Sequence, residues 1–138
     1  MILPILAVKN YDATRKFYME KLGFSSTLTM QGKEGENTFG FVKYGDTQVG
    51  LSQDSSDLTG RGNGVVLMIY PSDYDIDAHY EQVKNAKVPI VEEIKTEVWG
   101  DRLFAIQDLD GYYVTFAKTV HQPPPLDVIE TEMQKQSS

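Results

Sequence analysis

The same order of predicted elements occurs twice along this chain, and this repeat limits the available folds more than any other feature. Each half of the sequence predicts a strand, a helix and then three strands. Pairing Leu3 with Val65 and Tyr18 with Tyr80 gives the same offset of 62 residues. Few residues match between the halves, so the evidence is the order of the elements. Each such half leaves one concave sheet face uncovered, and we expect the two to pair around a cavity.

The first half is predicted to span residues 1–53. Asn10 has the chemistry of a helix N-cap and Gly23 that of a C-terminal stop, which bounds one helix. Pro4 has no backbone N–H, so it predicts either an edge strand or a point at which strand pairing lapses. The predicted elements are strands at 2–8, 24–30, 38–44 and 47–52, and a helix at 11–22.

The second half is predicted to span residues 65–118, after a polar connection at 54–64. Asp75 is the expected N-cap of its helix. Asp108–Gly111 has the composition of a tight turn, and Thr115 lies near the middle of the strand that follows. The predicted elements are strands at 65–70, 88–95, 102–107 and 112–117, and a helix at 76–86. The two halves together indicate an α+β fold.

The tail, residues 119–138, differs from both halves. Pro123–Pro125 predicts a stiff, extended spacer. Leu126, Ile129 and Met133 then repeat at helical spacing. Two interpretations remain open: a short helix that packs on its own body or on a partner chain, or a disordered terminus.

Composition excludes several classes of function. The 138 residues carry a formal net charge of −7, which argues against nucleic-acid binding because a phosphate backbone needs clustered Lys and Arg. The chain has no cysteine, which removes disulfides, zinc–thiolate sites and thiol catalysis. No apolar run is long enough to cross a membrane, and Met1–Val8 lacks the basic leader of a signal peptide. We therefore expect a cytoplasmic protein with no nucleic-acid or membrane partner.

Three groups of motifs resemble a known family and together cover about residues 1–118. They are Val8-Lys9-Asn10 with Lys16-Phe17-Tyr18 and Leu22-Gly23-Phe24; Asp75-Ile76-Asp77-Ala78; and Trp99-Gly100 with Asp108-Leu109-Asp110-Gly111. They resemble the vicinal oxygen chelate superfamily, which includes glyoxalase I, extradiol dioxygenases, and fosfomycin and bleomycin resistance proteins. The resemblance implies two βαβββ modules that form a partly open, eight-stranded, barrel-like sheet with a ligand cleft, usually in a homodimer. Asn10 and Leu109 replace the commoner aspartate and proline.

The resemblance also implies where a metal would be held. Metal-using members bind a divalent ion with His and Glu side chains from the first and fourth strands of each half. Aligned by pattern, these positions are Leu3, Gly50, Val65 and Thr115. Only Thr115 has a side-chain oxygen, and a neutral hydroxyl is a poor sole ligand. Shifting the alignment by two residues gives Ile5, Ser52, Leu67 and either Ala117 or Tyr113, which restores no site. We therefore predict no metal and no other cofactor.

Other catalytic chemistry finds little support. His79 is predicted on the second helix, at the surface or partly covered, and His121 has no partner at ligand spacing. Most aspartates fall at turns and caps, where they accept backbone hydrogen bonds. Gly60, Gly62 and Gly64 precede a strand rather than a helix, so a phosphate-binding loop is not expected. No catalytic residue is predicted.

The aromatic residues point to ligand binding. Phe39 and Phe41 share one strand face, Tyr113 shares a face with Thr115, and Trp99 stands at the mouth of the last hairpin. An apolar cleft with aromatic walls suits flat or amphipathic molecules. Ordinary core packing stays the simpler interpretation for each phenylalanine alone. Arg102 has two alternatives, a ligand carboxylate or a surface ion pair. The predicted ligand-binding residues are Phe41, Gly50, Trp99, Arg102, Tyr113 and Thr115.

These observations predict a metal-free, small-molecule binding protein similar to the bleomycin resistance branch. In that branch a homodimer sequesters an organic ligand, here one of cationic or aromatic character, in clefts walled by both chains. Two other classes stay open. One is a glyoxalase- or dioxygenase-type enzyme, acting as a lyase, isomerase or oxygenase, with a non-standard or absent metal site. The other is an interaction module whose tail helix docks on another protein.

Overall fold

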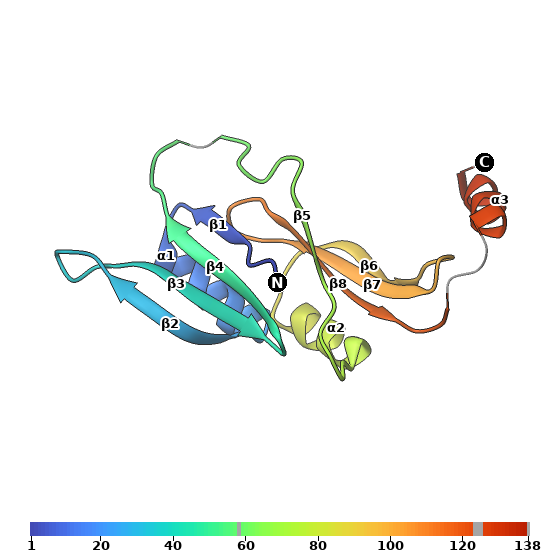
Figure 1. Ribbon diagram of the computed structural model, residues 1–138, viewed down its shortest axis with the longest axis horizontal. Helices are drawn as coiled ribbons and strands as arrows, with labels where there is room; N and C mark the ends of the chain where they lie inside the picture. Colours follow the sequence, from blue (N-terminus) through green and yellow to red (C-terminus); the bar gives the residue numbers. More distant parts are fainter. Residues whose placement is uncertain (58, 123–125, 138) are drawn as a thin grey trace.

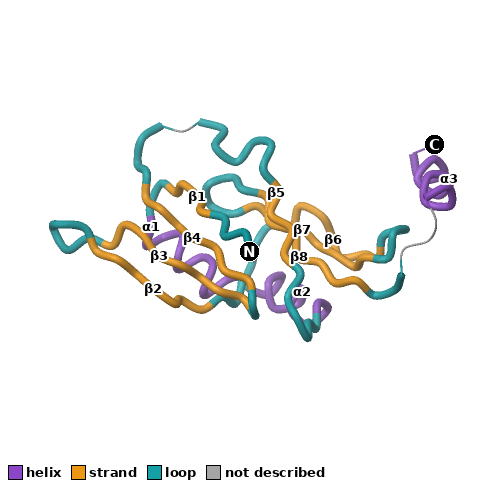
Figure 2. Tube along the Cα trace, viewed as in Figure 1, coloured by secondary structure: helices purple, strands orange, loops and turns teal. Residues whose placement is uncertain are grey.

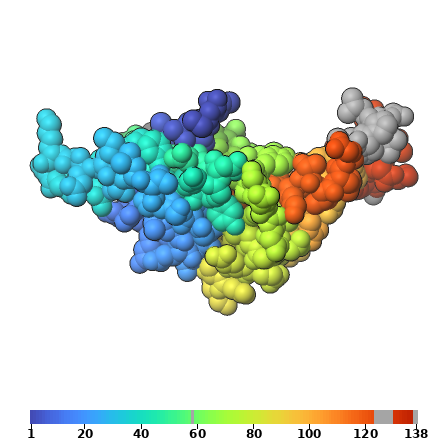
Figure 3. Space-filling model, turned by 60° about the horizontal axis from the view of Figure 1, so that its bottom comes forward, coloured from blue at the N-terminus to red at the C-terminus, as the bar shows by residue number. Residues whose placement is uncertain are grey.

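Two modules of the same topology lie side by side in an elongated molecule (Figure 1; Figure 3). The computed structural model describes residues 1–57, 59–122 and 126–137. The first module contains β1 (Ile5–Val8), α1 (Tyr11–Lys16), η1 (Phe17–Lys21), β2 (Ser25–Gln31), β3 (Asn37–Tyr44) and β4 (Thr47–Gln53). The second contains β5 (Val66–Ile69), α2 (Ile76–Asn85), β6 (Ile90–Thr96), β7 (Asp101–Gln107) and β8 (Tyr113–Thr119), and α3 (Leu126–Ser137) follows.

Each module forms its own four-stranded sheet. The strand orders are β1-β4-β3-β2 and β5-β8-β7-β6, so the two topologies are equivalent. In each sheet the first strand runs parallel to the fourth and the other neighbours are antiparallel. Figure 2 shows the two sheets as separate sets of strands. The α+β class and the βαβββ modules are thus confirmed, while the eight strands do not close into a barrel within one chain.

The first helix begins as predicted and ends differently. The Asn10 side chain accepts a hydrogen bond from the backbone N–H of Ala13 at 2.9 Å, which confirms the N-cap. After Lys16 the helix widens into the π-helical turn η1, where the Leu22 N–H donates to the Phe17 carbonyl five residues earlier. Gly23 follows with a φ of +83°, a conformation that glycine adopts without strain.

Three strands are shorter than the sequence predicts: β1, β6 and β5, which spans Val66–Ile69 instead of residues 65–70. The structure begins β1 at Ile5 instead of residue 2, and β1 lies at the sheet edge, as Pro4 indicates. The Pro4 carbonyl still accepts a hydrogen bond from Gly50 at 2.8 Å, but proline has no N–H to donate in return. At β6 the strand begins at Ile90 instead of residue 88, because Pro89 interrupts it in the same way.

One hydrophobic core joins the two modules. Phe24 and Tyr44 of the first module meet Phe116 of the second, with ring centroids 6.2 and 6.1 Å apart. The buried row Thr14, Tyr18 and Leu22 confirms the predicted inner face of the first helix, although Ala13 is exposed. The helix side of each sheet therefore faces a shared interior.

The tail follows the end of β8. α3 covers the stretch in which apolar residues repeat at helical spacing. Met133 is 49% exposed, while the Pro123–Pro125 spacer and the side chains of Leu126 and Ile129 lie outside the described residues. Of the helices described, none combines the length and the apolar character that a membrane crossing requires.

Candidate functional site

Alternation along the strands divides each sheet into a covered face and an open face. In β1 the side chains of Leu6 and Val8 are buried against the interior, whereas Ile5 points the other way and is 55% exposed. In β8 Val114 and Phe116 are fully buried, so Thr115 between them lies on the opposite face. We call the faces that point away from the shared core the open faces.

The open face of the first sheet is apolar and aromatic. Phe39 and Phe41 lie edge to face, with ring centroids 5.2 Å apart, and both are half-buried, so they are not the core residues that the simpler interpretation predicts. A Cβ on Gly50 would lie 3.2 Å from the Phe41 ring and 3.0 Å from the Ile5 side chain. The missing side chain at Gly50 therefore lets the Phe41 ring lie close to the sheet.

The open face of the second sheet combines small, apolar and hydroxyl-bearing side chains. Tyr113 and Thr115 share this face, as predicted, with Thr115 largely covered by its neighbours. Val66 and Met68 of β5 lie beside them, opposite Tyr113 and Thr115 respectively, and are 59% and 47% exposed. Because Phe41 and Gly50 belong to the other sheet, the predicted site residues divide between two separate surfaces of one chain.

The positions implied for a metal carry no suitable donors. Gly50 lies opposite Ile5 and Thr115 opposite Met68 in the two parallel strand pairs. Leu3 and Val65, the positions aligned by pattern, precede their strands. Within the described ranges, no three His, Asp or Glu side chains gather in a way that could hold an ion. The side chains at these positions do not fit a divalent metal, which needs imidazole or carboxylate ligands.

Two predicted ligand contacts lie elsewhere. Arg102 points to the helix side of its sheet, where its guanidinium binds the Asp77 carboxylate at 2.7 Å and the Thr96 hydroxyl at 3.2 Å. The structure thus favours the surface ion pair among its two alternatives. Trp99 lies half-buried in the turn between β6 and β7 of the second module, whereas Phe41 and Gly50 belong to the first.

A polar cluster that was not predicted from the sequence lies on the second open face. Asp101 is only 8% exposed, and its carboxylate accepts hydrogen bonds from the Tyr70 hydroxyl at 2.6 Å and the Thr119 hydroxyl at 2.8 Å. The hydrogen bond to Asp101 raises the pKa of Tyr70 to about 12. Asp101 and Thr119 face one another across β7 and β8, a relation that the hairpin register could have revealed.

His79 is buried, which corrects its predicted place at the helix surface. Its Nε2–H donates to the Leu22 carbonyl at 2.7 Å, and its Nδ1 accepts from the Tyr74 hydroxyl. The ring stacks on Tyr44 at 4.4 Å and meets Phe116 edge to face. Burial lowers the pKa of His79 below its usual value. Both ring nitrogens are engaged, so His79 joins the modules instead of serving as a metal ligand.

The aspartates of the last hairpin are structural, as predicted for turn residues. The buried Asp108 accepts hydrogen bonds from the Tyr18 hydroxyl at 2.7 Å and from the Tyr112 N–H at 3.0 Å. Burial raises the pKa of Asp108, and burial next to Asp108 raises that of Tyr18. Asp110 accepts from the Lys9 N–H at 2.8 Å and from the Thr14 hydroxyl at 3.0 Å. This turn of the second module thus fastens onto the first.

The glycine-containing connection has a packing role. Gly62 lies against the backbone of Gly111 and Tyr112, where a Cβ would clash. Arg61 donates to the Ala7 carbonyl at 3.2 Å and lies 3.7 Å from Asp110. The connection therefore packs against residues of both modules.

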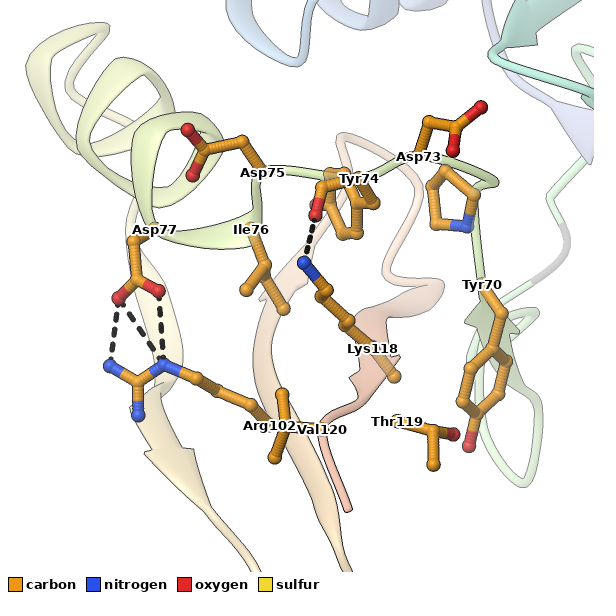
Figure 4. A pocket seen from close by; sticks show the side chains of 12 residues that line it. Tyr70, Asp73, Tyr74, Asp75, Ile76, Asp77, Arg102, Lys118, Thr119 and Val120 are labelled. Carbon is orange, nitrogen blue, oxygen red and sulfur yellow. Dashed lines mark hydrogen bonds and ion pairs between the residues drawn. The ribbon is translucent and has the colours of Figure 1, made fainter. Parts of the chain in front are cut away.

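Two cavities lie near the open faces. The first, of about 760 Å³, follows the outer edge of β8 near the start of α2 (Figure 4). The second, of about 370 Å³, lies where the N-terminal residues meet β4 and β5, and its lining includes Leu3, Val49 and Met68. Both volumes fall in the range of small-molecule sites.

Comparisons with known proteins identify the family and the fold. The sequence matches the Glyoxalase/Bleomycin resistance protein/Dioxygenase superfamily over residues 2–116. An uncharacterised protein of Mycobacterium bovis is 21% identical over 140 residues, which cover 96% of this chain and 91% of the relative. TioX from Micromonospora sp. ML1 has a similar structure, with a TM-score of 0.71 and 21% identity over 86% of this chain and 98% of TioX. A glyoxalase-related enzyme from Clostridium phytofermentans has a TM-score of 0.65 and 23% identity over 86% of this chain and 94% of its own.

Proposed function

Because this chain belongs to the Glyoxalase/Bleomycin resistance protein/Dioxygenase superfamily, we propose that it is a small-molecule binding protein of the bleomycin resistance type. It holds an organic ligand against its open sheet faces, with no metal ion and no chemical step. Sequestration of this kind requires only that the ligand bind the protein surface more favourably than water solvates it. A chain without cysteine also suits the reducing cytoplasm, where we expect it to act.

The chemistry of the paired strands carries this proposal. Where a metal-dependent relative would need imidazole or carboxylate donors, this chain has Ile5 opposite Gly50 and Met68 opposite Thr115. Hydrocarbon, thioether and neutral hydroxyl groups are poor ligands for the divalent ions that act as Lewis acids in metal-dependent enzymes. These side chains do offer apolar contact area to an organic molecule.

The ligand is apolar over most of its surface. The edge-to-face rings of Phe39 and Phe41 present an aromatic wall on the first open face. Aromatic rings bind flat molecules through stacking and edge contacts, each worth about 0.5–1.5 kcal/mol beyond the area buried. A separate cavity of about 370 Å³, where the N-terminal residues meet β4 and β5, adds apolar lining from Leu3, Val49 and Met68.

A second copy of the chain completes the cleft. Each open face exposes large apolar side chains to water, which is unfavourable for a chain on its own. They are Leu28 (47%), Met30 (52%), Val66 (59%) and Met68 (47%). Two copies related by a two-fold axis bring the first open face of one chain onto the second open face of the other. The ligand then lies between two sheets, and water is excluded from both sides.

Titration with the neutral dye N-phenyl-1-naphthylamine tests ligand binding. Trp99, the only tryptophan, supplies an internal donor whose emission overlaps the dye's absorption. We expect saturable dye binding that the Phe41→Ala variant weakens at least about fivefold, because a buried ring contact of about 1 kcal/mol is lost. Leu109→Ala, at an exposed turn residue, is the control and should bind like the wild type. Absence of saturable binding would refute the proposal.

Elemental analysis of protein purified without a histidine tag tests the metal. We expect Zn, Ni, Fe and Mn far below one ion per chain, both as purified and after dialysis against each metal. A stoichiometric ion that survives dialysis would overturn metal-free binding and favour the enzymatic alternative.

A further inference from the structure

Asp101 is a buried carboxylate that has two hydroxyl partners and, among the residues that the structure describes, no cationic one. Tyr70 and Thr119 each donate a hydroxyl hydrogen to one of its oxygens, at 2.6 and 2.8 Å. Among the described residues, no lysine, arginine or histidine lies within ion-pair distance of it. A buried charge is normally paired, so this carboxylate lacks the counter-charge that would stabilise it.

Two cations, Arg102 and Lys118, line the same cavity, and both are already engaged with other partners. Arg102, next in sequence, binds Asp77 at 2.7 Å. Lys118 donates to the backbone carbonyl of Tyr74 at 2.7 Å (Figure 4). Neither cation lies within ion-pair distance of Asp101, because alternation along β7 and β8 directs their side chains away from the sheet face that carries this carboxylate.

The two hydroxyl groups that hold Asp101 belong to residues that line the larger cavity. β5 pairs with β8 only as far as Ile69 opposite Phe116, so the outer edge of β8 from Ala117 to Thr119 is left open. Tyr70 and Thr119 border the cavity of about 760 Å³ at this edge (Figure 4). Tyr70 is 46% exposed, so its ring is accessible from the cavity.

The direction of these hydrogen bonds determines which chemical groups the cavity can bind. Each hydroxyl has one hydrogen, and both are donated to Asp101, so towards the cavity Tyr70 and Thr119 can only accept. Two acceptor oxygens, an exposed aromatic ring and an uncompensated negative charge behind them suit a positively charged nitrogen that carries hydrogens. Among the charged residues that line the cavity, carboxylates outnumber cations: Asp73, Asp75 and Asp77 against Arg102 and Lys118.

We propose that the cavity at the outer edge of β8 binds the ammonium group of an organic amine, with Tyr70 and Thr119 as acceptors and Asp101 as the counter-charge. The ammonium hydrogens point to the two hydroxyl oxygens, and the apolar part of the amine covers the Tyr70 ring and the neighbouring Val120. This site is separate from Phe41 and Gly50 and does not depend on dye binding at the first open face.

A matched pair of probes tests this site by calorimetry. The pair is 1-naphthylmethylamine and the neutral 1-naphthylmethanol, which share one ring system and differ in charge. We expect wild-type protein to bind the amine at least about tenfold more tightly than the alcohol, because hydrogen bonds to a charged group are the stronger ones. High salt should reduce that preference.

The variant Asp101→Asn should lower the affinity for the amine to that for the alcohol, while Asp57→Asn, the same charge change in the connection, should leave the tenfold preference intact. Equal wild-type affinities for the two probes, no binding of either probe, or an unchanged preference in a folded Asp101→Asn protein would overturn the proposal. If Asp101→Asn does not fold, the wild-type protein still tests the proposal. Its affinity must be higher for the amine than for the alcohol, and this difference must shrink at high salt. Dye binding that responds to Phe41→Ala but not to Asp101→Asn separates this site from the proposed sequestration.

Discussion

At the scale of single residues, the most informative side chain is His79. Its ring is enclosed by Tyr44, Tyr74 and Phe116, and both nitrogens are engaged within the protein. Its hydrogen bond to the Leu22 carbonyl stabilises the neutral tautomer with hydrogen on Nε2. Protonation would place a second hydrogen on Nδ1 and a charge among aromatic rings, so the folded state favours the neutral form.

This burial predicts an acid-sensitive contribution to stability. Because the pKa of His79 is lowered in the folded state, the unfolded chain binds a proton at this residue first as the pH falls below about 6.5. The free energy of unfolding should therefore decrease as the pH falls through this range, by at most about 1.4 kcal/mol per pH unit for one proton.

Urea unfolding from pH 7.5 down to 5.5 measures this effect. His79→Gln should be less stable than the wild type at pH 7.5 and should lose less stability on acidification. The exposed His121 is the control, and His121→Gln should keep the wild-type slope. An unchanged slope in His79→Gln would contradict the assignment.

At the scale of elements, the turn between β7 and β8 links the modules. Asp108 orders the turn by accepting from the Asp110 N–H at 2.9 Å, and it receives the Tyr18 hydroxyl from the π-helical turn η1. Gly111 adopts a φ of +92°, which the turn requires and which glycine tolerates. The turn therefore serves both the hairpin and the contact between modules.

Removing the Tyr18 hydroxyl tests this link. Tyr18→Phe leaves the buried Asp108 carboxylate without one donor, and we expect a loss of about 1–3 kcal/mol in the free energy of unfolding. Tyr113→Phe, which removes a hydroxyl from a partly exposed ring on the open face, should change stability by less than about 0.5 kcal/mol. Equal effects of the two substitutions in denaturant titrations would rule out a special role for the Tyr18–Asp108 pair.

At the scale of the whole molecule, the chain is elongated and its two open faces are not joined. The covered faces share one core, and the turn between β7 and β8 adds hydrogen bonds between the modules. The apolar side chains on the open faces stay exposed to water, and association with a second copy of the chain would bury them. Each face is half of the proposed cleft.

Light scattering coupled to size exclusion tests the proposed dimer. We expect wild-type protein to elute at about twice the chain mass of 15.6 kDa. Met68→Lys places a charge on the second open face and should shift the mass to that of one chain. Leu109→Lys, at an exposed residue of the β7–β8 turn, should remain dimeric. A wild-type monomer at high concentration would refute the shared cleft.

Local patterns in the sequence were sufficient for most of the fold. The caps at Asn10 and Asp75, the turn at Asp108–Gly111 and the repeated order of elements are all confirmed. These features depend on residues within a few positions of one another, so their chemistry is visible in the sequence. Because alternate residues of a strand lie on the same face, the sequence also predicts that Phe39 shares a face with Phe41 and Tyr113 with Thr115.

What the sequence alone determined is which residues share a face; only the tertiary structure decided what covers that face. His79 is buried against the first module, where its Nε2–H donates a hydrogen bond to the Leu22 carbonyl, 57 residues earlier in the chain. Arg102 faces Asp77 on α2, 25 residues away, while the adjacent Asp101 faces the opposite side with Tyr70. Such partners are chosen by how helices and sheets pack, and packing depends on contacts between distant segments that no local pattern records.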